Sequence, residues 1–524
     1  VDQTRTPMGA RLLAEWLTAP MTGLDAIARR HEVVAELVHE PELRQDLRGL
    51  LDQVNDVERL AARAATGRAT PRDLVGLGRT LGLLPRLKAR ITARDARRLR
   101  EIEAALELCP EIHAAIRDAL VDDPPLALKE GGLIREGYHP GLDELRETAQ
   151  GGKTWIARFQ AEQIRRTGIN SLKVGYNKIF GYYIEITHAH GSKVPPDYLR
   201  KQTVKNAERY ITPELKEYED KVLRAEERSR DLEYELFLTL RDRVAGEAPR
   251  LVQLGALLAE LDVFCGLAEL AARRGYTRPE MVSNPDLEIE GGKHPVLDAT
   301  MRHGDFVPND TRLGQTANSG DATSSGMVLL ITGPNMAGKS TYIRQVALIA
   351  ILAQAGSFVP AHRARIGVVD RLFARIGATD ELARGLSTFM VEMTETANIL
   401  HNATSRSLVI LDEIGRGTST FDGISLAWAI VEHLHDTIGC RTLFATHYHE
   451  LVALEASKTR LRNANVEVRE NDGEIVFLHR IVPGGADQSY GIHVARLAGV
   501  PEPVIDRARD ILQFTERGAS EPIM

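Results

Sequence analysis

The sequence predicts a multidomain protein: an all-α core with long lever helices, a small β-rich module, and a C-terminal α/β domain. Three observations predict this organisation. Apolar residues recur at helical spacing over residues 1 to about 135, a basic and aromatic stretch runs from Lys173 to Lys216, and strand-like apolar runs alternate with helical segments beyond residue 286. The 524 residues are enough for three or four domains and a sizeable core.

The first part of the chain reads as one helix after another, with Leu, Ala and Arg at helical spacing and little strand signal. Prolines punctuate it, as is usual where helices begin or end: Pro20, Pro41, Pro71 and Pro110. After a glycine-containing loop at residues 130–138, a further helix is predicted from about Leu142 to Arg166.

The composition changes between Lys173 and Lys216. This stretch has eight Lys or Arg residues against four Asp or Glu residues, and six of the chain's 27 aromatic residues. Strand character around Ile179 and from Tyr183 to Thr187 indicates a small β-rich module with a positive surface, suited to nucleic-acid phosphates. On charge alone, an ordinary solvated basic face is an equal alternative. The net charge of the whole chain is −7, so any nucleic-acid contact must be local.

A long helix is predicted to follow the module. Thr212 suits the N-cap, Pro213 the first helical position and Glu214 the first turn. Apolar residues then recur at heptad-like intervals from Leu215 to Leu236, interrupted at Ser229, which is typical of a helix packed along another helix. The helix is expected to run to Val244. We therefore expect the module at the tips of two long helices, a geometry that transmits motion to the α/β domain.

A phosphate-binding loop is the most informative motif. The segment Gly333–Ser340 fits G-x-x-x-x-G-K-S, follows an apolar strand-like run and leads into a helix. Backbone N–H groups and the helix N-terminus would cradle phosphates, Lys339 would reach the β- and γ-phosphates, and Ser340 would hold Mg²⁺. The residues predicted to bind the nucleotide here are Gly333, Pro334, Asn335, Met336, Ala337, Gly338, Lys339, Ser340 and Thr341.

Two further strands end in polar residues. The apolar run Ser407–Leu411 ends in Asp412 and Glu413, and a third strand predicted at 441–445 ends in Thr446 and His447. Asp412 at such a position can hold Mg²⁺ and Glu413 can polarise an attacking water, while His447 can sense the γ-phosphate. The sequence therefore predicts ATP and Mg²⁺ as ligands, with Lys339, Glu413 and His447 as catalytic residues.

The tail of the chain contains a hairpin signal at residues 471–473 and two helices separated by residues 499–501. A DNA-reading helix-turn-helix is disfavoured, because Glu502, Asp506 and Asp510 would face a phosphate backbone. Apolar residues of these helices suit packing against another surface.

Composition limits the remaining classes of protein. Three widely spaced cysteines argue against a disulfide framework and a zinc site. Because no uninterrupted apolar run of membrane-spanning length and no signal peptide is recognised, we expect a cytoplasmic protein without a membrane partner. The chain starts at Val1 rather than Met, which favours a fragment of a longer protein.

Together these motifs resemble the MutS family of DNA mismatch repair ATPases, within the ABC-type superfamily. The resemblance covers essentially the whole chain. It rests on the phosphate-binding loop and on residues 354–361, 386–393, 411–419, 445–448, 172–177 and 205–210.

The resemblance implies further site residues. Gln354 is similar to a glutamine near Mg²⁺, and Ser387 with Thr388 resembles the signature segment that acts on the nucleotide of the partner subunit. Phe306 and Val307 match positions that contact adenine, and His479 matches one that stacks on the base. The β-rich module resembles the family's clamp, which implies DNA binding through Lys201, Lys205 and Arg209.

The resemblance also implies a homodimer on double-stranded DNA, a downstream repair partner of MutL type, and a nucleoid-associated location. The expected domains are a helical core with the first lever helix (1–170), the clamp (171–217), the second lever helix and return to the core (218–285), the ABC-type P-loop ATPase domain (286–488), and a helix-turn-helix dimerisation element (489–524).

Two departures from the family keep alternatives open. No segment of the sequence matches the family's N-terminal mismatch reader, with its Phe-x-Glu motif, or its connector domain, so we expect this chain to lack both modules. One alternative is a recombination-type relative that naturally lacks the reader. Another is a generic P-loop ATPase of the ABC type, either a kinase or a transport ATPase. The signature segment and the helical arm disfavour a kinase, and the lack of any cue for a membrane partner disfavours a transport ATPase.

Overall fold

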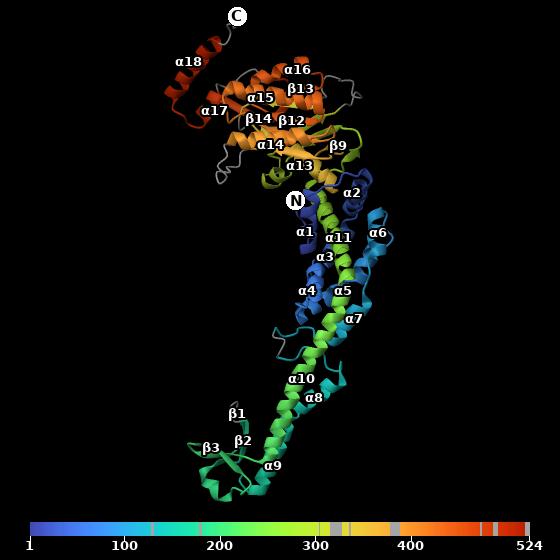
Figure 1. The fold of residues 1–524 in the computed structure, drawn as a ribbon, viewed down its shortest axis with the longest axis vertical. Coiled ribbons are helices and arrows are strands. Elements are labelled where there is room, and N and C mark those ends of the chain that lie inside the picture. Colours follow the sequence, from blue (N-terminus) through green and yellow to red (C-terminus); the bar gives the residue numbers. More distant parts are fainter. Residues whose placement is uncertain are drawn as a thin grey trace. The chain divides into compact units, whose positions relative to one another are not determined.

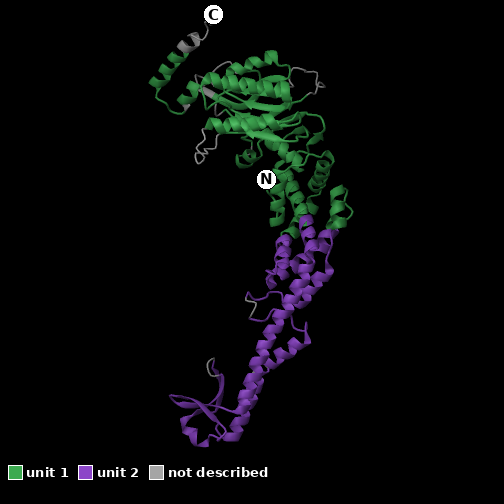
Figure 2. Ribbon diagram, viewed as in Figure 1, with its two compact units in different colours: residues 1–52, 90–105, 258–524 green, residues 53–89, 106–257 purple. Residues whose placement is uncertain are grey.

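The computed structural model describes residues 1–126, 130–177, 181–302, 304–314, 327–334, 337–377, 388–471, 474–485 and 491–518. The chain divides into two compact units (Figure 2). Unit 1 contains residues 1–52, 90–105 and 258–524, and unit 2 contains residues 53–89 and 106–257. The helical first part of the chain therefore contributes to both units.

Helices fill residues 7–119, as the apolar spacing predicts. Four of them begin at a proline, whose fixed φ and missing N–H suit the first helical position, and Pro20 lies in a connection. The helices are α1 (Pro7–Thr18), α2 (Leu24–His39), α3 (Pro41–Leu51), α4 (Val57–Ala65), α5 (Pro71–Ile91), α6 (Arg97–Ala105) and α7 (Pro110–Ala119) (Figure 1).

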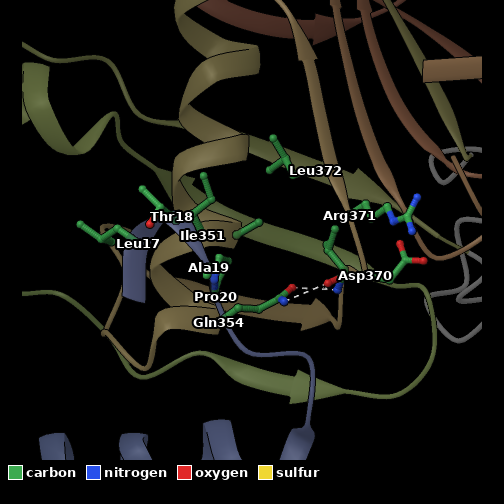
Figure 3. Close-up of a pocket in the computed structure, with 11 residues that line it drawn as sticks. Leu17, Thr18, Ala19, Pro20, Ile351, Gln354, Asp370, Arg371 and Leu372 are labelled. Atoms are coloured by element: carbon green, nitrogen blue, oxygen red, sulfur yellow. Dashed lines mark hydrogen bonds between the residues drawn. The ribbon is translucent and has the colours of Figure 1, made fainter. Parts of the chain in front are cut away.

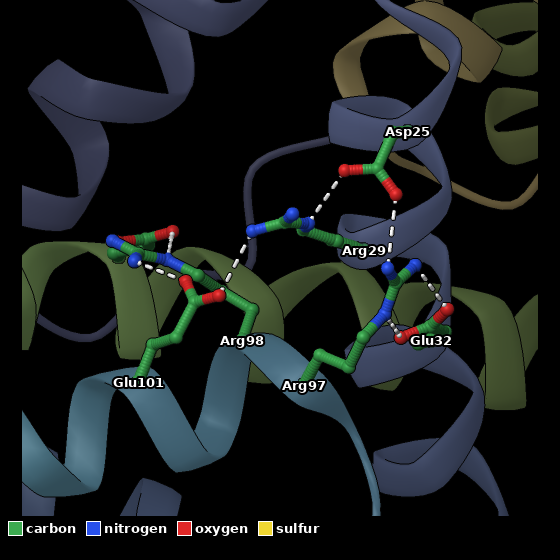
Figure 4. A network of polar contacts seen from close by, with 7 residues as sticks. Asp25, Arg29, Glu32, Arg97, Arg98 and Glu101 are labelled. Carbon is green, nitrogen blue, oxygen red and sulfur yellow. Dashed lines mark hydrogen bonds and ion pairs between the residues drawn. The ribbon is translucent and has the colours of Figure 1, made fainter.

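Within unit 1, ion pairs connect α2, α6 and α11 (Ala248–Arg274) (Figure 4). Arg29 contacts Glu101 at 2.9 Å, and Arg97 contacts Glu32 at 2.8 Å. Arg98 reaches Glu260 of α11 at 2.7 Å. Exposed pairs of this kind contribute little one by one, but a network of Arg forks fixes the relative rotation of the helices.

One helix corrects the expectation about membrane-spanning length. Among the described residues, α11 alone is long and apolar enough to cross a membrane by length and composition, with a mean hydropathy of 1.7 over its most apolar stretch. That stretch is 78% buried inside the protein, as in the core helix of a large helical assembly.

The β-rich module forms an antiparallel sheet in unit 2, in the order β1-β2-β4-β3. Its strands are β1 (Lys173–Asn177), β2 (Gly181–Thr187), β3 (Leu199–Val204) and β4 (Ala207–Ile211), with a short helix η1 (His188–Lys193). Ile184, Ile186 and Tyr198 are buried together with Phe159 and Tyr210. The predicted β-rich module is thus confirmed.

Two long helical segments adjoin this sheet. The predicted second helix is confirmed as α10 (Pro213–Gly246), and its N-cap Thr212 accepts a hydrogen bond from the Leu215 N–H at 3.2 Å. The predicted single helix over 142–166 is wrong. The structure has α8 (Pro140–Gln150) and α9 (Gly152–Thr167), because two adjacent glycines favour a break.

A six-stranded sheet forms the core of the C-terminal α/β part, in the order β10-β11-β12-β8-β13-β14. All neighbours are parallel except the β13–β14 hairpin. The strands are β8 (Val328–Thr332), β10 (Leu372–Arg375), β11 (Leu408–Asp412), β12 (Arg441–Ala445), β13 (Leu461–Asn471) and β14 (Glu474–Pro483). The predicted hairpin is confirmed, although its turn at 472–473 lies outside the described residues.

Helices cover both faces of this sheet. Ile331, Ile410 and Leu443 pack with α13 (Lys339–Ala355), whereas the alternate residues Leu330 and Val409 pack with α14 (Thr388–Asn402) and α15 (Thr420–Glu432). A strand buried on both faces has no polar alternation, which is why these runs are continuously apolar.

A second sheet and the tail complete unit 1. The order β5-β9-β6-β7 joins β5 (Glu280–Val282), β6 (Leu287–Gly292), β7 (Asn309–Leu313) and β9 (Arg363–Gly367). The remaining elements are α12 (Pro295–Thr300), η3 (His433–Ile438), η4 (His449–Ala453), α16 (Leu454–Ser457), α17 (Gly491–Leu497) and α18 (Glu502–Gly518). The two predicted tail helices are thus present.

Candidate nucleotide site

Three adjacent strand ends form one edge of the six-stranded sheet. Because β11, β12 and β8 are parallel neighbours, their carboxyl ends at Asp412, Ala445 and Thr332 lie side by side. The phosphate-binding loop, Glu413 and His447 follow these three ends directly. The structure therefore brings together the residues that the three motifs placed separately in the sequence.

The loop after β8 encloses a buried cation. Gly333 and Gly338 have φ values of 129° and 108°, which favour glycine. Lys339, only 3% exposed, begins α13 and donates to the carbonyl of Gly333 and, at 3.0 Å, to that of Pro334. Burial lowers the pKa of Lys339, and the nearby Glu413 and Asp412 carboxylates partly oppose this. A buried ammonium at a helix N-terminus attracts a polyphosphate. Asn335 and Met336 lie outside the described residues.

Ser340 and Asp412 offer oxygen ligands to a metal. The Ser340 hydroxyl donates to the Asp412 carboxylate at 2.9 Å, and Asp412 is 8% exposed. A hydroxyl and a carboxylate are the hard donors that Mg²⁺ prefers. In the described part of the chain, no group of three or more His, Cys, Asp or Glu residues could hold a metal ion. Mg²⁺ at this pair would therefore depend on phosphate and water oxygens as well.

Glu413 is held in a strained conformation by its neighbours. Its φ of 56° is unusual for a residue other than glycine, and its N–H donates to the Ala445 carbonyl at 2.9 Å. Its carboxylate lies 3.9 Å from the Lys339 ammonium and 2.5 Å from the Arg416 guanidinium. Arg416 was missed as a site residue, although a cation three residues after the acid was a visible signal.

His447 faces the same edge with an unpaired nitrogen. Its half-buried imidazole has a buried Nδ1 without a hydrogen-bond partner, and the ring lies 4.2 Å from that of Tyr448. Burial lowers the pKa of His447, and the nearby Arg416 and Lys339 cations lower it further. The imidazole is therefore neutral at neutral pH and can donate or accept one hydrogen bond.

A cavity of about 200 Å³ adjoins the loop, and we name it the base cavity. Phe306, Val307 and His479 line it, together with Gly338 and Thr341 of the loop and first turn. His479 Nδ1 lies 2.9 Å from the Ala337 carbonyl, which places the ring beside the loop. The structure thus brings the three residues matched to adenine contacts next to the phosphate-binding loop.

The position of Gln354 corrects its expected role. It lies near the other end of the 17-residue α13, roughly 22 Å along the helix from Lys339 at 1.5 Å per residue. Its amide donates to the carbonyls of Met21 and Val369 and accepts from the Val369 N–H, at 2.7–2.9 Å. It lines a separate cavity of about 310 Å³ beside residues 17–20 (Figure 3). Gln354 therefore fixes local structure here, and this position does not support a role near Mg²⁺.

The matched signature segment is only partly described. Ser387 lies outside the described residues, and Thr388 begins α14. Glu392 of that helix is 5% exposed and accepts a hydrogen bond from the Gly415 N–H at 2.5 Å. Arg375 lies 3.9 Å from the same carboxylate. This contact, which the motifs did not predict, connects the signature helix to the loop that follows Glu413.

If the site hydrolyses ATP, as the sequence predicts, Glu392→Ala should lower the hydrolysis rate about tenfold, because a hydrogen bond that positions the loop after Glu413 is lost. Glu392→Gln keeps an acceptor at the same place and should retain most of the activity. Steady-state kinetics of both variants, with thermal unfolding as the folding control, measure this. Equal activity of Glu392→Ala and the parent protein would show that the contact has no positioning role.

The β-rich module presents only part of its expected basic surface. Lys201 on β3 and Lys205 in the β3–β4 turn are exposed. Arg209 is engaged internally: its guanidinium pairs with Glu185 at 2.9 Å and lies 4.2 Å from the centre of the Tyr183 ring. Arg209 therefore stabilises the sheet, which corrects its assignment as a phosphate contact.

Comparisons with known proteins decide the family. Residues 1–268 match the family model described as MutS domain III, and residues 329–516 match that of MutS domain V. This chain belongs to the MutS family. It is 57% identical over 516 residues to a protein from Rhodopirellula baltica, 55% over 521 residues to one from Symbiobacterium thermophilum, and 54% over 519 residues to one from Salinibacter ruber. Each of these relatives is named DNA mismatch repair protein MutS.

The matches cover 98–99% of this chain but only 56–59% of each relative. The chain thus spans less than two thirds of the length of these MutS relatives. Because the chain belongs to the MutS family, it is not a generic P-loop kinase or transport ATPase. The names of the relatives favour a mismatch repair protein over a recombination-type relative.

Proposed function

We propose that this chain is an ATP-hydrolysing DNA clamp of MutS type that acts in DNA mismatch repair. One observation carries the proposal: Lys339, the Ser340–Asp412 pair, Glu413 and His447 converge at three adjacent strand ends. These are the groups that phosphoryl transfer to water needs, namely a phosphate clamp, a metal-holding pair and a base.

Each residue has a distinct role in this proposal. Lys339 would neutralise the β- and γ-phosphates. Ser340 and Asp412 would hold Mg²⁺, which would supply positive charge at the phosphates. Glu413 accepts a proton from the attacking water, for which its ion pair with Arg416 must open. His447 uses its unpaired Nδ1 to sense the γ-phosphate. Phe306, Val307 and His479 hold the base.

We further propose that two copies of the chain form composite sites. Met390 on α14 and Phe421 on α15 expose 55% and 84% of their surface on helices that follow the signature segment and the Glu413 loop. Exposed large apolar side chains beside an active site suit burial by a second subunit. Ser387 would complete the partner's site, and α17 with α18 would add dimer contacts. The expected domain limits, the cytoplasmic location and a MutL-type partner belong to the same proposal.

The clamp should hold DNA through its phosphates. In the described part of the clamp, no recognition helix carries a cluster of Asn, Gln and Arg of the kind that reads base edges. Exposed Lys201 and Lys205 suit phosphate contacts, which give salt-dependent binding that is blind to sequence.

We expect this 524-residue chain to bind a matched duplex and a single-mismatch duplex with affinities within about 1 kcal/mol of each other. Reversing both Lys201 and Lys205 to Glu should weaken both duplexes alike and lower the log–log salt slope by roughly two. Fluorescence anisotropy titrations at two salt concentrations measure both effects.

Lys221→Glu is a matched control, because it reverses an exposed charge on α10, outside the clamp sheet. A tenfold preference for the mismatch would show that this chain reads lesions itself. Unchanged salt slopes in the double variant would remove the clamp assignment.

A further inference from the structure

The wall of the base cavity contains a buried amide without a partner. Gln345 lies on α13, six positions after Lys339, and is fully buried at 0% exposure. Neither its Nε2 nor its Oε1 has a hydrogen-bond partner, although the side chain lines the base cavity. A buried amide that makes no hydrogen bond is costly, so it calls for a function.

The other buried polar side chains of this wall are satisfied. The Tyr342 hydroxyl bonds Thr311 at 2.9 Å and the Asp310 carbonyl at 3.1 Å. Asn309 donates to the His479 carbonyl at 3.0 Å and accepts from the Ile481 N–H at 2.7 Å. These contacts use the polar groups of Tyr342 and Asn309 for the fold. The Gln345 amide keeps two N–H donors and two acceptor lone pairs without a partner.

The chemistry of an amide limits what it can recognise. An amide pairs in bidentate fashion with adenine, donating to N7 and accepting from the N6 amino group. Guanine presents two acceptors, N7 and O6, along the same edge, so the amide oxygen would face another oxygen. A buried amide therefore discriminates strongly, because the wrong base leaves polar groups unpaired.

We propose that Gln345 reads the N6/N7 edge of the base and makes this site selective for adenine nucleotides over guanine nucleotides. The proposal rests on the proposed nucleotide function and adds its specificity determinant. Apolar contacts from Phe306 and Val307 cannot make this distinction, since both purines present similar faces to them.

Calorimetric titrations of the whole chain with ADP, GDP and 7-deaza-ADP test the proposal, because 7-deaza-ADP has a C–H in place of the N7 acceptor. The parent protein should bind ADP about tenfold or more tightly than either analogue. In Gln345→Met, which fills the same space without polar atoms, ADP and 7-deaza-ADP should bind equally. Gln163→Met makes the same substitution at a buried amide of unit 2, outside the nucleotide site, and should leave the ADP preference unchanged.

The outcomes separate the two proposals. If the parent protein binds no nucleotide, the proposed function fails and the specificity proposal fails with it. If the parent protein binds ADP and 7-deaza-ADP equally, only the role of Gln345 is overturned, and this measurement needs no variant to fold. A 7-deaza penalty of the same size in the parent and in Gln345→Met also overturns it. Loss of thermal stability in Gln345→Met, with base selectivity retained, would assign the amide to packing beside Gly292 instead.

Discussion

A Glu413→Ala protein is expected to bind ATP as the parent does but to hydrolyse it about 10²-fold or more slowly, as for loss of a general base. The physical reason lies in the geometry: the carboxylate stands at the strand end beside Lys339 and Asp412, where an attacking water would be polarised. Equilibrium binding of ATP and single-turnover hydrolysis measure the two parts separately. Turnover at the parent rate would remove Glu413 as the base.

Two companion variants sharpen this test. Glu413→Gln keeps the size of the side chain but cannot accept the proton, so it should be nearly as slow as Glu413→Ala if the role is that of a base. Lys339→Ala should instead lose nucleotide binding itself, because a buried charge-assisted contact to phosphate disappears. If Glu413→Gln were as active as the parent, the carboxylate would be a positioning group.

Much of the site could be predicted because its signals are local. A phosphate-binding loop needs glycines, a strand before it and a helix after it, and all three are contiguous in the sequence. Asp412 ends a continuously apolar run, and His447 follows a short strand-like segment by one residue, so both positions near strand ends could be read directly. That these ends are neighbours, through the β11-β12-β8 order, came from the three-dimensional pairing.

The errors have a common physical cause, which is that partners distant in sequence decide a side chain's role. The resemblance to the family's clamp assigned Arg209 to DNA, but the antiparallel register of β2 and β4 places Glu185 opposite it. A motif match assigned Gln354 to the metal, but continuing α13 carries it to the far end of the helix. Gln345 gave no signal at all, because an amide in an apolar helix is notable only once its burial and missing partners are known.

The composite-site arrangement predicts that two inactive proteins restore activity when mixed. A Lys339→Ala chain has an inactive phosphate-binding loop but an intact Ser387. A Ser387→Arg chain has an intact phosphate-binding loop but an inactive signature segment. In a mixed dimer, one site is broken twice, and the other combines the intact loop with the intact Ser387. With random pairing and independent sites, a one-to-one mixture should recover roughly a quarter of the parent activity.

The matched control is a mixture of Lys339→Ala with Glu413→Ala. Lys339 and Glu413 lie 3.9 Å apart in the same chain, so every site in that mixture carries one of the two lesions and no activity should return. Subunit exchange is verified with differently labelled chains. If ATPase activity returns in the mixture of Lys339→Ala and Ser387→Arg but not in the control mixture, Ser387 must act on the partner's site. A residue that acts only within its own chain could not restore the site of the other subunit. If exchange is complete and neither mixture regains activity, Ser387 does not act on the partner's nucleotide.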